Sequence, residues 1–106
     1  MSSKIKYHRD ASKRLTFTVD EIPANLYKEI VNRIKSKFDL KPLGKVISNG
    51  FDVAFRDYAS GSMIVGLEWD NWSGFIVVAK SPESEPLVRL IGDWFEMIRP
   101  ELIVQE

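Results

Sequence analysis

Apolar and polar residues alternate along several short stretches of the chain, and this period of two is typical of half-buried strands. The first stretch is 14–19, where Leu15, Phe17 and Val19 are the apolar members. A short strand follows at 46–47, before the hairpin signal Asn49-Gly50, and alternation resumes over 51–56 and 63–70. Residues 75–79 are apolar throughout, as in a strand covered on both faces. We therefore expect about five strands.

Two further stretches repeat their apolar residues at helical spacing. The first begins at Pro23, a residue suited to the first helical position, and ends before Pro42 and Gly44. Its expected buried face consists of Leu26, Tyr27, Ile30, Val31, Ile34 and Phe38. The second begins at Ser81-Pro82 and is expected to stop at Pro100, leaving 102–104 as a last short strand or a docked tail. Its expected buried face consists of Leu87, Leu90, Ile91, Trp94, Phe95 and Ile98.

The order of elements is therefore β-α-β-β-β-β-α. Two helices outside a continuous run of antiparallel strands predict an α+β fold, with an antiparallel sheet of about five strands and both helices packed on one face. Residues 1–13 are basic and hold only two large apolar side chains, so we expect a flexible N-terminal tail followed by a single domain over 14–106.

The pairing of the middle strands can be predicted, because their apolar sides must agree. We expect Phe51 opposite Trp69 and Phe55 opposite Val65, facing the helices, and Trp69 opposite Phe75 in the next hairpin. The face turned away from the helices then carries three rows, which are Asp52–Glu68–Ile76, Ala54–Gly66–Val78 and Arg56–Ile64–Lys80.

The composition excludes several kinds of active site but does not identify one. The chain of 106 residues has no cysteine and one histidine, His8, which excludes thiol chemistry and any two-histidine metal site within one chain. Its six glycines have no phosphate-binding spacing, and no apolar run approaches the ~20 residues of a membrane helix. We expect a cytoplasmic protein with no cofactor and no membrane partner, and more readily a binding protein than an enzyme.

The expected outer sheet face and the turn over 70–74 form the main candidate site. Tryptophan is frequent at interface hot spots, so Trp72 in this turn is either a binding anchor or a lid folded onto the core edge. The small and aliphatic patch beside it is either a surface for a protein partner or a second copy, or is covered by one of the chain's tails. The candidate partner-binding residues are Asp52, Ile64, Glu68, Asp70, Asn71, Trp72, Ile76 and Val78.

Two alternatives remain open from the sequence. The first 45 residues hold 11 Lys or Arg and 5 Asp or Glu, whereas the rest of the chain holds 4 and 10. A nucleic-acid-associated protein would use the basic N-terminal arm and the first helix, with candidates Lys4, Lys6, Arg9, Lys13, Arg14, Lys35 and Lys37. A metal-dependent enzyme would use a carboxylate pair, with Asp52, Glu68 and Asp70 as weak metal-ligand candidates.

The order of elements is similar to that of small bacterial accessory proteins, including some toxin-neutralising immunity proteins. This is a likeness of layout and not of motif, and layout alone does not define function. In an immunity-type role, the acidic residues around Trp72 would occlude a basic active site. The sequence thus favours a small non-enzymatic interaction module.

Overall fold

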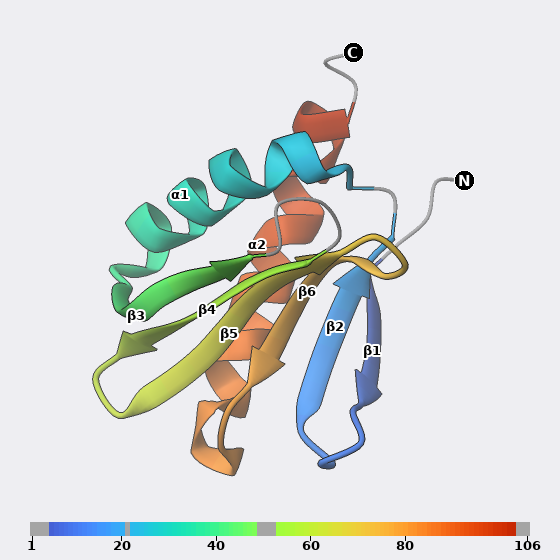
Figure 1. The fold of residues 1–106 in the computed structure, drawn as a ribbon. Helices are drawn as coiled ribbons and strands as arrows, with labels where there is room; N and C mark the ends of the chain where they lie inside the picture. The colour runs from blue at the N-terminus through green and yellow to red at the C-terminus, as the bar shows by residue number, and fades with distance from the viewer. Residues whose placement is uncertain (1–4, 21, 49–52, 104–106) are drawn as a thin grey trace.

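The computed structural model describes residues 5–20, 22–48 and 53–103, and it shows a single antiparallel sheet with two helices on one face (Figure 1). The elements in chain order are β1 (Lys6–Arg9), β2 (Leu15–Val19), α1 (Tyr27–Phe38), β3 (Lys41–Ser48), β4 (Val53–Ser60), β5 (Met63–Asp70), β6 (Gly74–Ala79) and α2 (Glu85–Ile103). Short 3-10 turns at Ala24–Leu26 and Pro82–Ser84 lead into the helices. The six strands lie in the order β1-β2-β6-β5-β4-β3. The expected α+β fold class is confirmed, with one strand more than expected.

The additional strand is β1, which lies in the segment expected to be a flexible tail. It pairs with β2 from Lys6 opposite Thr18 to Arg9 opposite Leu15. Tyr7 explains why this short strand docks, because its ring packs edge-on against Phe17, at 5.6 Å between ring centroids. A Cβ added to Gly92 of α2 would lie only 2.0 Å from the Tyr7 hydroxyl oxygen, so the glycine makes room for the ring.

The helices bury most of the residues predicted from their spacing. Ile30, Val31 and Ile34 of α1 are buried, and α1 ends at Asp39, which adopts the left-handed conformation with φ 55°. Two expectations for α2 are wrong. The helix continues through Pro100 to Ile103, although a proline has no N–H to donate to the preceding turn. Leu90 is 55% exposed, since it lies on the solvent side of the helix.

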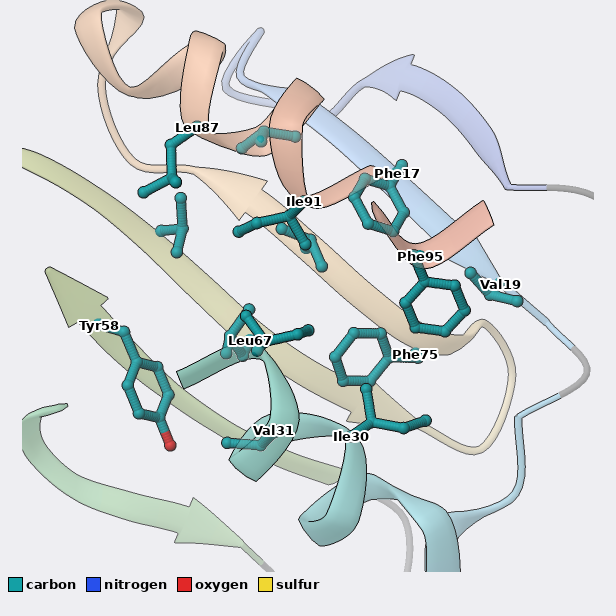
Figure 2. Packing of buried hydrophobic residues seen from close by; sticks show 14 of the residues in the cluster. Phe17, Val19, Ile30, Val31, Tyr58, Leu67, Phe75, Leu87, Ile91 and Phe95 are labelled. Carbon is teal, nitrogen blue, oxygen red and sulfur yellow. The ribbon is translucent and has the colours of Figure 1, made fainter. Parts of the chain in front are cut away.

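The core lies between the helices and the inner face of the sheet (Figure 2). Phe17 of β2, Phe75 of β6 and Phe95 of α2 form its aromatic centre, and all three side chains are fully buried. Phe75 and Phe95 stack with 5.8 Å between centroids. At the edge of the core Trp69, expected to be a packing residue, is buried and donates its indole N–H to the carbonyl oxygen of Ile22 at 2.8 Å.

The two central hairpins differ in how well their pairing was predicted. The β5–β6 pairing is confirmed, with Trp69 opposite Phe75 and Gly66 opposite Val78. The predicted β4–β5 pairing is wrong, because Phe55 lies opposite Glu68 rather than Val65. The shift is an odd number of residues, so it exchanges the two faces of β4.

The cause of the β4 shift is the turn that joins it to β5. The segment 58–62 was expected to be a loop, whereas β4 continues to Ser60 and pairs there with Met63, leaving a two-residue turn at Gly61-Ser62. Gly61 has φ +62°, a conformation that favours glycine in tight hairpins. In this register Tyr58 enters the core and Phe55 moves to the outer face. The expected hairpin turn at Asn49-Gly50 lies outside the described residues.

Candidate functional site

The sheet face opposite the helices, called here the outer face, carries the candidate site. The helices pack on one side only (Figure 1), so this face is covered by no helix or strand among the described residues. The pairing places three rows across the central strands. They are Phe55–Glu68–Ile76, Asp57–Gly66–Val78 and Ala59–Ile64–Lys80. Ala54 and Arg56, which were expected in these rows, lie instead on the inner side of β4.

A set of three ionised side chains, called here the charged cluster, spans β4, β5 and the end of β6. The Lys80 ammonium lies 3.4 Å from an oxygen of Asp57 and 3.6 Å from an oxygen of Glu68. All three side chains close over Gly66, where an added Cβ would lie 2.8 Å from both Glu68 Oε2 and Lys80 Cε. The ion pairs of the charged cluster therefore link β4, β5 and the end of β6 on the outer face.

One residue of the outer face is unexpectedly buried. Val78 is only 4% exposed, although no described helix lies on this side of the sheet. Its neighbour Gly66 lies beneath the Glu68 and Lys80 side chains, and the stems of long charged residues commonly cover apolar surface. Val78 is therefore not an accessible contact residue.

The Glu68 side chain is largely buried within the charged cluster. Burial raises the pKa of Glu68 above its ordinary value, and the Asp57 carboxylate acts in the same direction. Lys80 opposes both effects by favouring the ionised carboxylate, and it offsets only part of the cost of desolvation.

The accessible apolar side chains lie next to the charged cluster. Phe55 is 38% exposed and Leu43 of β3 is 42% exposed, and they occupy neighbouring rows of adjacent strands. Ile64 and Ile76, both predicted as contact residues, are half-buried on the same face. These four residues, called here the apolar residues of the outer face, lie beside two carboxylates that share one ammonium group. Such a combination suits contact with a protein surface.

The β5–β6 turn, residues Asp70–Gly74, holds Trp72 out in solvent at one end of the sheet. Asp70 Oδ1 accepts hydrogen bonds from the backbone N–H groups of Trp72, at 2.9 Å, and Ser73, at 2.5 Å. Gly74 closes the turn with φ +79°. The Trp72 side chain is 75% exposed, which favours the anchor interpretation over the lid interpretation. Asn71 in the same turn is exposed as well.

The structure does not assemble the carboxylate group expected from the sequence. Asp52 lies outside the described residues, and Glu68 lies opposite Phe55 on the neighbouring strand. The Asp70 carboxylate accepts two backbone hydrogen bonds within the turn. Within residues 5–20, 22–48 and 53–103, no three His, Cys, Asp or Glu side chains are grouped as metal ligands would be. The described part therefore gives the proposed carboxylate–metal enzyme no support.

The basic N-terminal arm is likewise not a continuous cationic surface. Lys6 lies 3.6 Å from Asp20, Arg9 pairs with Glu85, and Arg14 lies 2.9 Å from Asp10. Lys4 is outside the described residues. Lys13, Lys35 and Lys37 are at least partly exposed, but Lys13 lies in the β1–β2 turn and the other two lie on α1. Pairing with neighbouring carboxylates thus reduces the charge that the arm can offer to phosphates.

Sequence reasoning missed Phe55, Leu43 and Asp57 as outer-face residues. Phe55 and Asp57 were hidden by the register of β4, which depends on the length of the Gly61-Ser62 turn. Leu43 was missed because β3 begins at Lys41, whereas a strand was expected only at 46–47. The signal for the β4 register is the Gly-Ser pair itself, because a glycine of positive φ is common in two-residue hairpins. Lys80 and Glu68 were placed on the correct face, but Asp57 was not.

Comparison of the chain with protein-family models, with curated proteins and with solved structures found no match. The chain is therefore described by its architecture alone. It is an α+β domain whose sheet has one face covered by helices and one open face. Neither described helix combines the length and apolar character needed to cross a membrane.

Proposed function

We propose that this protein is a non-enzymatic interaction module that binds another protein, or a second copy of itself, through the outer face and the β5–β6 turn. The observation that carries the proposal is the exposure of Trp72 on a turn that is fixed by two hydrogen bonds to Asp70. A large side chain on a preorganised turn loses little conformational freedom on binding, which is why tryptophan is frequent among hot-spot residues.

The apolar residues of the outer face extend the proposed contact surface. Phe55 and Leu43 offer accessible apolar area, and the neighbouring charged cluster is already paired within the chain. Because two carboxylates share one ammonium, the proposed contact leaves this cluster at its solvated rim, where no uncompensated charge is buried at a cost of several kcal/mol. The proposed contact thus depends on apolar side chains rather than on acidic ones.

This geometry changes the immunity-type version of the proposal. That version used acidic residues around Trp72 to occlude a basic active site. Glu68 pairs with Lys80, and Asp70 accepts two backbone hydrogen bonds, so neither carboxylate is free to neutralise a partner. An accessory or immunity-type protein remains compatible with the proposal if its contact is mainly apolar.

The test compares the wild-type chain with Trp72→Ala and Phe55→Ser in two assays. Sedimentation velocity over a range of concentrations measures self-association, and tagged protein in a lysate of the native host captures partners for identification by mass spectrometry. We expect one stoichiometric association that survives raised salt and is lost in both variants. Truncation of a hot-spot residue typically costs at least ~2 kcal/mol of binding free energy, or about 30-fold in affinity.

Met97→Ala provides the matched control, because Met97 is 77% exposed on α2, on the helix-covered side of the molecule. We expect this variant to associate as the wild type does. Equal loss in Met97→Ala would show that the contact is not on the outer face. Association that is unchanged in both Trp72→Ala and Phe55→Ser would refute the proposed site.

A further inference from the structure

A groove of about 850 Å³ opens along the solvent side of α1, away from the outer face and not used by the proposed function. Its described lining comes from α1, from Asn25 in the 3-10 turn before α1, and from Trp94 of α2. The lining residues are Asn25, Lys28, Glu29, Asn32, Arg33, Ser36, Lys37 and Trp94. The groove is shallow and open to solvent along its length.

Among the described lining residues, cations outnumber anions. Lys28, Arg33 and Lys37 lie there with one described acidic residue, Glu29, which is 3.3 Å from Arg33 in an ion pair one turn apart. The two lysines are nine residues apart, which is roughly 14 Å along the helix axis and two and a half turns around it. They therefore lie at opposite ends and on opposite flanks of the described lining, and either one attracts an anionic ligand.

The aromatic wall of the groove is Trp94, which is half-buried and held by its neighbours. Its ring is nearly perpendicular to that of Phe38, with 6.0 Å between centroids, and also to that of Phe95 at 6.5 Å. An indole fixed in this way offers a planar apolar surface with no further ordering cost. The amides of Asn25 and Asn32 add both donors and acceptors.

We propose that this groove binds a nucleoside phosphate, either free or as part of a single-stranded nucleic acid. The ligand joins in one molecule the three features that the groove selects: an anionic phosphate for one of the two lysines, a planar base for Trp94, and polar base and ribose edges for the asparagines. Stacking of bases on aromatic side chains beside cationic residues is the general mode of single-strand recognition.

The test is a titration of the isotope-labelled chain followed by nuclear magnetic resonance, with the Trp94 indole N–H and the α1 amides as reporters. The probes are AMP, adenosine, inorganic phosphate, a tetra-aspartate peptide and an oligoadenylate RNA. We expect saturable shifts at these reporters with AMP and at least about tenfold weaker binding of adenosine or phosphate alone. Tighter binding of the oligoadenylate, falling steeply with salt, would assign the ligand to single-stranded RNA, whereas equal binding would assign it to free nucleotides.

Variants locate the site. The double variant Lys28→Gln/Lys37→Gln removes two lining charges that form no ion pair with the part of the chain the structure describes, and we expect it to weaken AMP binding at least about tenfold. The matched control is Lys41→Gln/Lys45→Gln, which removes two exposed lysines of β3 outside the groove and should bind as the wild type does. Trp94→Phe keeps an aromatic ring, and we expect it to weaken AMP binding more than phosphate binding.

Three outcomes would overturn the proposal. They are the absence of saturable shifts with AMP, binding of tetra-aspartate or phosphate as tight as that of AMP, and equal weakening in the control lysine variant. The result is independent of the proposed function, because Trp72→Ala leaves every residue of the groove intact.

Discussion

Replacement of Gly74 by alanine tests how tightly the β5–β6 turn is held against β2. The structure gives Gly74 a φ of +79°, and an added Cβ would lie 2.2 Å from the carbonyl oxygen of Val19 and 2.7 Å from Cα of Asp20. Both atoms belong to the backbone, so neither can rotate away as the end of a flexible side chain would. Relief requires β2 to separate from β6 at the pairing of Val19 with Phe75, two fully buried residues.

A second glycine allows the two costs of Gly74→Ala, backbone strain at positive φ and overlap of the added Cβ with β2, to be measured separately. Gly61 has φ +62°, close to that of Gly74, but an added Cβ there meets nothing within 4 Å. Gly61→Ala should therefore cost only the strain of a left-handed alanine, about 1–2 kcal/mol. Gly74→Ala carries the same strain, and the displaced strand adds a lost ladder hydrogen bond, at about 1 kcal/mol, and disturbed core packing. We expect a total of at least about 3 kcal/mol for Gly74→Ala.

The assay is guanidinium denaturation of both variants, together with thermal melting followed by circular dichroism. A change of 1 kcal/mol corresponds to ~4–8 °C in a domain near this size, so Gly61→Ala should lose about one such step and Gly74→Ala at least three. Asparagine accepts positive φ more readily but still carries a Cβ. Gly61→Asn should therefore recover most of the loss, whereas Gly74→Asn should not. Equal stabilities of the Gly61 and Gly74 variants would refute the steric reasoning.

Three further predictions concern the register, the tryptophans and pH. Phe75→Ala should cost about 3–5 kcal/mol, as for other buried phenylalanines, whereas Phe55→Ala should cost under about 1 kcal/mol; similar losses on denaturation would contradict the β4 register. Trp69→Phe should cost about 1–3 kcal/mol by leaving a buried carbonyl unpaired, while Trp72→Ala should stay within about 0.5 kcal/mol, which melting curves would check. The raised pKa of Glu68 means that its contribution to stability is present below its ordinary pKa of 4.5 and is lost as pH rises through the folded-state pKa. Denaturation of the wild type and Glu68→Gln across that window should show the wild type losing stability relative to the variant, and a pH-independent difference would contradict the assignment.

The candidate surface shows where sequence reasoning succeeds and where it stops. Trp72 was recognised as either an anchor or a lid from its place in a turn, and the structure exposes it. Glu68 was placed on the correct face, but the sequence paired it with Asp52, whereas the structure brings Lys80 beside it. Side chains that meet across strands are set by register, and local alternation does not contain that information.

The sequence by itself determined the α+β class, the buried faces of α1, most of the buried face of α2, and the pairing of β5 with β6. These features follow from local periodicity and from the strong apolar match between Trp69 and Phe75. The tertiary structure alone decided three others: the docking of β1, the face on which Phe55 lies, and the burial of Val78 on the outer face. Each depends on contacts between residues distant in the chain, such as Tyr7 with Gly92, or on the exact length of a turn. In β4 both faces carry an aromatic residue, Phe55 or Tyr58, so periodicity could not choose between them, and the two-residue turn at Gly61 fixed which one entered the core.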